Sequence, residues 1–140
     1  IEYMPIGNAR MSPESNLYTA ETQNRLATLG ELMPIGRQAN GGPAKRYRIK
    51  DAPGELGFIS SVSHHFCDRC NRLRLTASGQ LRVCLLSDQQ TDLRTPLRSG
   101  ASDAELAHLF HKAVRQKKAH HHLATPTGPR VTGQMSGIGG

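Results

Sequence analysis

The sequence has 140 residues, 36% of them hydrophobic, with three tyrosines, three phenylalanines and no tryptophan, which suits a single small core with many loops. The formal charge is +7, and 13 of the 18 basic residues are arginine, whose planar guanidinium binds phosphate and carboxylate bidentately. We therefore expect an anionic partner. No basic run is interleaved with aromatic residues, which argues against a nucleic acid as that partner.

The chain has no stretch that approaches the roughly 20 apolar residues of a membrane-spanning helix, and no apolar signal-peptide core near its start. Its three cysteines are an odd number, and two of them form a C-x-x-C pair. This usage is typical of thiolates that bind metal in a reducing compartment, not of a secreted disulfide framework. We expect a soluble, cytoplasmic protein that does not associate with a membrane.

The first segment, Ile1–Met4, alternates weakly and stops at Pro5. We interpret it as the end of a strand that begins before this sequence does, which makes the sequence a fragment. A helix is expected within residues 19–32. Three leucines of that helix are expected to face the core: Leu26, Leu29 and Leu32.

Two β-hairpins are expected in the middle of the chain. The first joins residues 45–49 to 56–60 through residues 51–54, where proline fixes φ and glycine leaves it free. The second joins residues 72–76 to 81–84, because polar and apolar residues alternate on both sides of an Ala-Ser-Gly turn.

The second hairpin explains the spacing of the cysteines, Cys67-x2-Cys70-x13-Cys84, because its return strand brings the third cysteine back beside the first two. Three thiolates are then available, without a fourth. A structural zinc site would need a fourth ligand, and His64 or His65 is close enough in sequence to supply it. A four-iron cluster held by three cysteines instead keeps one iron open, where a substrate atom can bind.

Two arginines follow the second cysteine directly. Arg72 and Arg74 are two residues apart on the expected strand, so they project from the same face. Next to an incomplete metal site, their guanidinium groups can bind a polyphosphate or the edge of a purine; elsewhere such a pair would be ordinary solvated surface. Arg69 and Arg82 are expected to face solvent or to serve packing.

The clearest helix signal is the capping box Ser102–Glu105, which predicts a helix through about residue 118. The run His120–His122 can in principle bind metal, but we expect a solvated segment after the helix. The tail beyond it is rich in Gly, Pro, Ser and Thr and is expected to be mobile. Five apolar residues of the helix are interpreted as core packing: Leu106, Leu109, Phe110, Ala113 and Val114.

The chain resembles the C-terminal part of the radical S-adenosylmethionine GTP 3′,8-cyclase family, which catalyses the first step of molybdenum cofactor biosynthesis. The resemblance rests on FCDRCNRLRLTASGQLRVCLL (residues 66–86), the upstream IEYMPIG and the final Gly-Gly, and it covers essentially the whole chain. Its specific part is the combination of C-x2-C-x13-C, an R-x-R directly after the second cysteine, and the terminal double glycine.

The resemblance implies that Cys67, Cys70 and Cys84 hold a 4Fe-4S cluster whose open iron faces GTP, so that the substrate replaces the missing ligand. In the family, a second 4Fe-4S cluster on a C-x3-C-x2-C motif of the N-terminal half cleaves S-adenosylmethionine. That motif is absent here, so this chain alone is expected to be inactive. The radical takes a hydrogen from the GTP ribose, and the sugar then joins carbon 8 of guanine to give 3′,8-cyclo-7,8-dihydro-GTP.

Further site residues are implied by the same resemblance. The family tail enters the active site, where residues without a β-carbon permit close approach of the backbone. The implied residues are Arg72, Leu73 and Arg74 for GTP, Met4 for S-adenosylmethionine, and Gly139 and Gly140 for catalysis.

We expect an α+β architecture. Residues 1–35 are expected to be the closing strand and helix of an incomplete TIM-type barrel, whose strand ends carry the site. Residues 36–140 are expected to form an antiparallel, cluster-bearing domain with a flexible Gly-Gly tail. The implied partners are GTP, a second copy in a homodimer, and cyclic pyranopterin monophosphate synthase downstream. The rival interpretation is a zinc-stapled module that binds nucleic acid or a protein.

Overall fold

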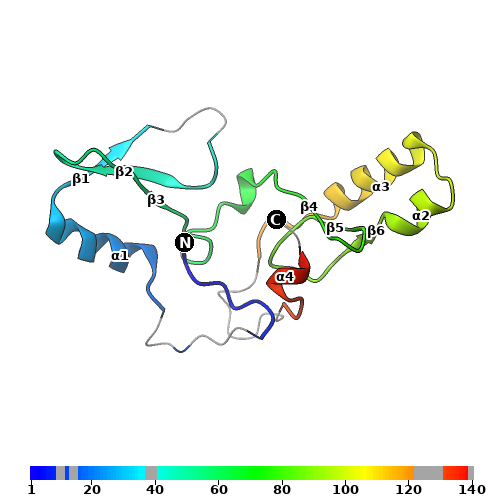
Figure 1. Cartoon of the computed structure of the whole chain (residues 1–140), viewed down its shortest axis with the longest axis horizontal. Coiled ribbons are helices and arrows are strands. Elements are labelled where there is room, and N and C mark those ends of the chain that lie inside the picture. The colour runs from blue at the N-terminus through cyan, green and yellow to red at the C-terminus, as the bar shows by residue number, and fades with distance from the viewer. Residues whose placement is uncertain (9–11, 13–15, 37–40, 122–130, 139–140) are drawn as a thin grey trace. The chain divides into compact units, whose positions relative to one another are not determined.

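The chain forms two compact units, each built around an antiparallel sheet of three strands (Figure 1). The first unit comprises residues 1–4 and the described residues up to Phe66, and the second comprises residues 5–8 and the described residues from Cys67 onward. The predicted α+β class is confirmed; the sheets that the structure describes do not form a closed barrel. The computed structural model describes residues 1–8, 12, 16–36, 41–121 and 131–138.

In the first unit, a helix leads into the sheet. The first predicted hairpin is confirmed, because β2 pairs with β3 with Lys45 opposite Phe58 and Tyr47 opposite Leu56. The rings of Tyr47 and Phe58 meet edge to face, with centroids 5.5 Å apart. The elements are α1 (Thr19–Leu26), the 3-10 turn η2 (Ala27–Leu29), β1 (Leu32–Ile35), β2 (Lys45–Ile49) and β3 (Leu56–Phe58).

The predicted helix is confirmed but is shorter than residues 19–32. Leu29, expected in the core, is exposed, and Leu32 instead begins β1, where it lies opposite Ile49. Gly30 separates the two elements, since its φ of +146° suits a residue without a side chain. A Cβ atom there would lie 2.8 Å from Ile49 Cγ2, so the packing against β2 also leaves no room for a side chain at this position.

The start of the chain forms no strand among the described residues, contrary to the prediction for Ile1–Met4. Glu2 attaches this segment to its unit instead. Its carboxylate accepts hydrogen bonds from the backbone N–H groups of Thr19 (3.0 Å), Val62 and Ser63 (both 2.8 Å). The Ser63 hydroxyl donates a fourth bond. The Glu2 N–H also donates to the Ile59 carbonyl at 3.1 Å, so Glu2 attaches the segment through its backbone as well as its buried side chain.

The second unit holds the second predicted hairpin, with strands shorter than expected. β4 pairs with β5, with Arg74 opposite Arg82 and Leu75 opposite Leu81, and β5 pairs with β6. The elements are the 3-10 turn η3 (Cys67–Arg69), β4 (Arg74–Leu75), β5 (Gln80–Arg82), β6 (Thr91–Asp92), α2 (Arg94–Arg98), α3 (Asp103–Arg115) and α4 (Met135–Ile138).

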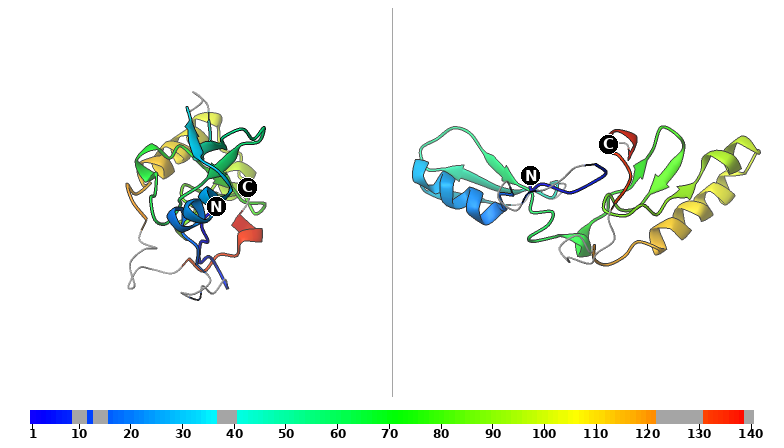
Figure 2. Two further views of the ribbon diagram at one scale, coloured as in Figure 1. Left: turned by 90° about the vertical axis from the view of Figure 1, so that its left-hand side faces the viewer. Right: turned by 90° about the horizontal axis from the view of Figure 1, so that it is seen from below.

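The long helix α3 packs against β5 and begins at the predicted capping box (Figure 2). Glu105 accepts from the Ser102 N–H at 2.8 Å, and the Ser102 hydroxyl accepts from the Glu105 N–H at 3.3 Å. Ala113 is buried with Leu81, Val83 and Leu93, and Leu109 packs against this core. Phe110 and Val114 were predicted in the core but are exposed, because the short sheet covers only a narrow stripe of the helix.

The described part of the C-terminal tail, residues 131–138, packs onto its unit, although the composition predicts a mobile segment. Val131 and Ile138 are buried, and Ile6 forms a parallel bridge with Val131. The Gly7 N–H donates to the Val131 carbonyl at 2.9 Å. Over the described ranges, no helix is both long and apolar enough to cross a membrane.

Candidate functional site

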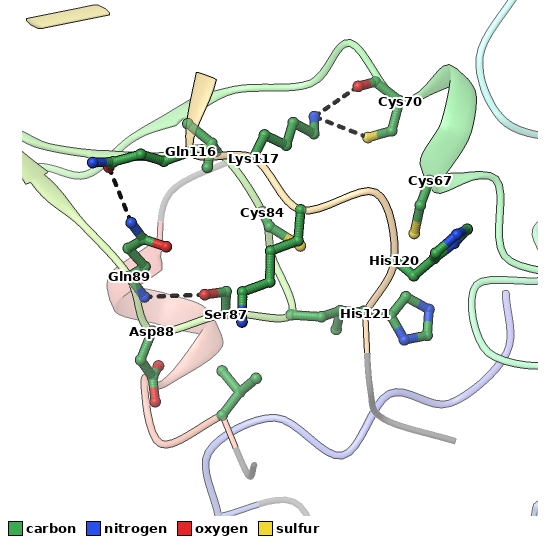
Figure 3. A pocket seen from close by; sticks show the side chains of 14 residues that line it. Cys67, Cys70, Cys84, Ser87, Asp88, Gln89, Gln116, Lys117, His120 and His121 are labelled. Atoms are coloured by element: carbon green, nitrogen blue, oxygen red, sulfur yellow. Dashed lines mark hydrogen bonds between the residues drawn. The ribbon is translucent and has the colours of Figure 1, made fainter. Parts of the chain in front are cut away.

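The three cysteines line a single cavity of about 260 Å³ in the second unit (Figure 3). Cys67 begins η3 and Cys70 directly follows this turn, with the Cys70 N–H donating to the Cys67 carbonyl at 3.2 Å. Cys84 follows β5, so the hairpin brings it back to the pair as the spacing predicts. All three are free, half-buried thiols.

The thiols differ in acidity. Burial raises the pKa of Cys70, but hydrogen bonds from the Arg72 backbone and Lys117, together with the charges of both residues, outweigh burial and lower this pKa. Burial raises the pKa of Cys67, as do the charges of Cys84 and Cys70, and a backbone hydrogen bond from His121 only partly offsets the increase. These mutual effects place the three sulfurs in one electrostatic neighbourhood.

The predicted GTP tripeptide lies next to this cavity along the chain. Arg72 and Arg74 are half-buried and Leu73 between them is exposed, so the two arginines share one face, as the sequence predicts. Strand β4 itself begins only at Arg74.

Arg74 interacts electrostatically with the cysteines. Burial lowers the pKa of the Arg74 guanidinium, and the neighbouring charges of Arg72 and Arg82 lower it further. Thiolates at Cys70 and Cys84 act in the opposite direction. Arg72 and Arg74 thus place two positive charges near the cysteine sulfurs, and an anion bound there would relieve their repulsion.

Arg69 and Arg82 were expected to face solvent or to serve packing, and each has one of these roles. Arg69 is exposed and lies 3.5 Å from the Asp68 carboxylate. Arg82 is only 1% exposed and serves packing. Its guanidinium donates to the Ser87 carbonyl and to Asp88 Oδ1, the latter at 3.3 Å.

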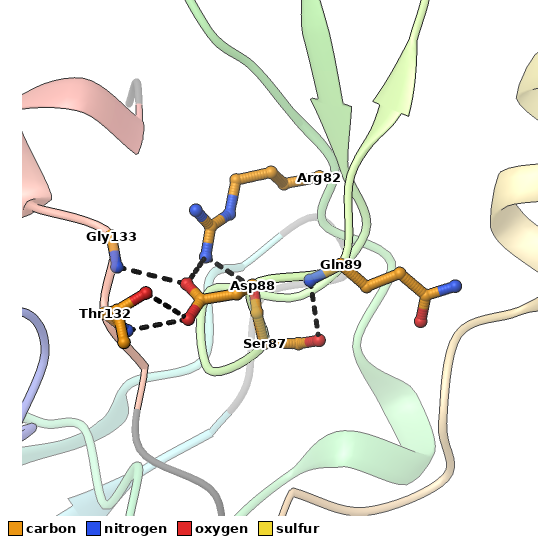
Figure 4. Close-up of polar contacts among 6 residues, drawn as sticks. All are labelled: Arg82, Ser87, Asp88, Gln89, Thr132 and Gly133. Carbon is orange, nitrogen blue, oxygen red and sulfur yellow. Dashed lines mark hydrogen bonds and ion pairs between the residues drawn. The ribbon is translucent and has the colours of Figure 1, made fainter.

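Asp88 connects the loop after Cys84 to the C-terminal segment (Figure 4). Its Oδ2 accepts from the Thr132 N–H (2.7 Å) and hydroxyl (2.8 Å), and Oδ1 accepts from the Gly133 N–H (3.1 Å). A Cβ on Gly133 would lie 2.8 Å from Arg82 Nη1, so the segment approaches the buried arginine as closely as a glycine permits.

Among the cavity-lining residues that sequence analysis did not place in the site are Lys117, His120 and His121, which follow α3. The Lys117 ammonium donates to the carbonyl of Cys70 (2.7 Å), to its sulfur (3.4 Å) and to the Arg72 carbonyl (3.0 Å). Nothing local distinguishes this lysine from other basic residues after a helix. The histidine run was a visible signal, but it was interpreted as solvated.

The remaining predicted residues belong to the first unit or lie outside the described residues. Met4 is a half-buried residue of the first unit. His64 and His65, considered as zinc ligands, also belong to the first unit, where His64 Nδ1 lies 3.1 Å from the Ser63 hydroxyl. The predictions for His122, Gly139 and Gly140 lie outside the described residues.

The donor chemistry of the cavity fits a thiolate-bound metal group, since three free cysteines face it and hydrogen-bond donors approach two of them. Among the residues with a described position, no three His, Cys, Asp or Glu side chains converge on one metal position. The fit therefore rests on the donor set and the shared cavity.

Comparison with known proteins identifies the family. A family model described as Molybdenum Cofactor Synthesis C matches residues 1–123. The chain belongs to this family. It is 49% identical to a GTP 3′,8-cyclase of Pelotomaculum thermopropionicum and 45% identical to one of Moorella thermoacetica, over its whole length in both comparisons. It spans 43% of the length of each of these relatives. A GTP 3′,8-cyclase of Caulobacter vibrioides is 39% identical over the whole chain, which covers 40% of that relative.

Proposed function

We propose that this chain is the substrate-holding, C-terminal part of a GTP 3′,8-cyclase that acts in molybdenum cofactor biosynthesis. Cys67, Cys70 and Cys84 would hold a 4Fe-4S cluster, which supplies an open iron position to the substrate. The observation that carries the proposal is the single cavity lined by three free thiols. The names of the related proteins support GTP as the substrate.

The protein environment acts in opposite directions on two of the proposed ligands, Cys70 and Cys67. Cys70 has a lowered pKa, so its thiolate is available near neutral pH more often than an ordinary cysteine's. Cys67 has a raised pKa, so binding metal there displaces a proton that burial otherwise retains. Metal binding should accordingly release protons and weaken at low pH.

The arginine face is the proposed GTP site. Arg72 and Arg74 would make charge-assisted hydrogen bonds to phosphate oxygens or to the purine edge. Burial and like charges lower the Arg74 pKa, so this face is stabilised by a bound anion. Leu73, exposed between the two arginines, offers its apolar surface to a ligand held there.

The other implied residues extend the proposal. Met4 would contact S-adenosylmethionine, and Gly139 and Gly140 would pass close to the substrate and orient it. In an enzyme that ends with this chain, deletion of both glycines should leave the cluster and much of the GTP affinity intact but sharply lower cyclisation. Wild-type turnover after the deletion would remove the tail from the site.

The complete reaction needs groups from outside this chain. A second 4Fe-4S cluster and S-adenosylmethionine would generate the radical, and the proposed product is 3′,8-cyclo-7,8-dihydro-GTP. A homodimer and a downstream cyclic pyranopterin monophosphate synthase are the proposed protein partners. The residues of this chain bind, orient and shield the nucleotide.

Anaerobic reconstitution with iron and sulfide tests the proposal. We expect a brown protein with about four irons per chain, whose electron-nuclear couplings in the reduced state change when GTP is added. A colourless protein that binds zinc stoichiometrically and no iron would support the zinc-stapled module. If the cluster forms but its spectra do not change at saturating GTP, the cysteines bind iron as proposed, but GTP does not bind at the cluster.

A further inference from the structure

The segment directly after α3, residues 117–121, approaches two of the three cysteines and is hereafter called the post-helix segment. The side-chain ammonium of its first residue, Lys117, donates three hydrogen bonds, all of them to Cys70 and Arg72. We propose that Lys117 is a positioning residue that fixes Cys70 against the arginine tripeptide and tunes the reduction potential of the group bound by the thiols. This inference rests on the proposed function.

The contacts of Lys117 account for all the hydrogen atoms of its ammonium group. An ammonium has three donors, and three acceptors surround it: the Cys70 carbonyl at 2.7 Å, the Arg72 carbonyl at 3.0 Å and the Cys70 sulfur at 3.4 Å. Half-burial of the side chain separates it from ordinary surface lysines, whose ammonium groups face water. One cation therefore bridges a ligand residue and the start of the tripeptide.

The base of Lys117 is held by the core of the unit. Ala113, one helical turn earlier, is buried against Leu81 and Val83. The Lys117 N–H donates to the Val114 carbonyl at 3.0 Å, and the side chain of the preceding Gln116 accepts from Gln89 Nε2 at 3.0 Å. Because the backbone at Lys117 is held in place, the three contacts of its ammonium group can fix the position of the motif relative to α3.

The other end of the post-helix segment reaches a second ligand. The His121 backbone donates a hydrogen bond to Cys67. This bond lowers the Cys67 pKa, whereas burial raises it. The same segment thus donates to two ligand residues from positions 117 and 121. Cys84 reaches the cavity from the hairpin, so the ligands are held from two sides (Figure 3).

Two physical consequences follow for a bound cluster. Hydrogen bonds to ligand sulfurs and nearby positive charge both stabilise the reduced, more negative state, which raises the reduction potential. The bridge between the carbonyls of Cys70 and Arg72 also keeps the tripeptide at a constant distance from the ligand. Loss of Lys117 should therefore affect the potential, the retention of iron and the affinity for GTP together.

The test uses three variants of the anaerobically reconstituted chain. Lys117→Met removes the charge and the donors at similar side-chain length, and Lys117→Arg restores the charge and several donors. Lys118→Met is the matched control, because Lys118 lines the same cavity and carries the same charge. The measurements are the midpoint potential of the reconstituted cluster, the rate of iron loss to a chelator, and GTP binding.

We expect the midpoint potential of Lys117→Met to fall below that of Lys118→Met, with about 10-fold faster iron loss. Lys117→Arg should recover part of the shift in potential. Equal potentials and equal iron loss in Lys117→Met and Lys118→Met would overturn the inference, and leave the proposed function intact. Failure of the unaltered chain to bind iron would instead contradict the proposed function. If Lys117→Met does not fold, Lys117→Gln, which keeps two donors but no charge, takes its place: a midpoint potential below that of Lys118→Met supports the inference, and a potential and iron loss equal to those of Lys118→Met overturn it.

Discussion

The two units differ in how the charges of their partly or fully buried side chains are compensated. In the first unit, the Glu2 carboxylate is 4% exposed and accepts hydrogen bonds from three backbone N–H groups and one hydroxyl, all within that unit. In the second unit, Arg72 and Arg74 repel each other beside a cavity lined by thiols. The hydrogen-bonded network around Glu2 stabilises the folded state, whereas the like charges of Arg72 and Arg74 disfavour it unless an anion such as the proposed substrate binds there.

The largest effect should come from removing one thiol, which should abolish metal binding in the second unit and leave the first unit unchanged. Cys84→Ala leaves two cysteines, too few to retain the proposed cluster, so bound iron should fall from about four atoms per chain to nearly none. Iron and sulfide analysis after anaerobic reconstitution measures this. Ser87→Ala, at another residue lining the cavity, should retain iron. Full iron content in Cys84→Ala would exclude it as a ligand.

The contribution of the Glu2 hydrogen bonds to the stability of the first unit is tested by Glu2→Gln. Burial raises the Glu2 pKa, but the hydrogen bonds from Ser63, Thr19 and Val62 outweigh it and lower the pKa from 4.5 to about 2. A shift of this size corresponds to about 3 kcal/mol of folding free energy. Because the folded-state pKa is depressed, this stability is complete above pH 4.5 and is lost as the pH falls toward 2.

Urea unfolding of wild type and Glu2→Gln at pH 7 and pH 3 measures that contribution. The difference between the two proteins should be about 3 kcal/mol at pH 7 and clearly smaller at pH 3. Glu31→Gln, an exposed acid of the same unit, should unfold like the wild type at both pH values. A pH-independent difference would show that side-chain shape, not ionisation, is responsible.

The arginine pair of the second unit predicts a smaller effect, which appears only when GTP is present. Arg72→Ala and Arg74→Ala should each weaken GTP binding by about 1.5 to 3 kcal/mol for every charge-assisted bond lost. Lysine at either position keeps the charge but not the planar fork, so it should restore only part of the affinity. Calorimetry under anaerobic conditions measures the change, with the exposed Arg98→Ala as the charge control. Unchanged affinity in the double alanine variant would remove the tripeptide from the site.

The smallest effect concerns Asp88. Its carboxylate accepts several hydrogen bonds, as that of Glu2 does, but it belongs to the second unit. Its carboxylate accepts three bonds from Thr132 and Gly133, but the side chain is 37% exposed, so Asp88→Asn should cost only about 1 to 2 kcal/mol. The amides of Thr132 and Gly133 should then exchange hydrogen faster. Asp103→Asn changes the same charge at the start of α3 and should leave this exchange unaltered. Unchanged exchange in Asp88→Asn would mean that burial of Val131 and Ile138 alone holds the segment.

Local sequence signals predicted the elements whose causes lie within a few residues. The capping box at Ser102 and the turn residues 51–54 correctly predicted α3 and the first hairpin, since both depend on nearby backbone bonds. The failures occurred where a distant residue decides the outcome. Leu32 joins β1 because it pairs with Ile49, and residues 131–138 pack because Asp88 binds them.

The sequence alone determined the candidate ligands and the arginine pair, because cysteine spacing and the alternation of a strand are local properties that survive in any context. Only the tertiary structure decided what surrounds them. Lys117 reaches Cys70 across 47 positions of the chain, and the burial of Arg82 depends on a loop and a C-terminal segment that no local pattern connects. The contact of Lys117 with Cys70 depends on the packing of α3 on β5, which brings residues far apart in the sequence within hydrogen-bonding distance. No periodic pattern in the sequence predicts such a contact.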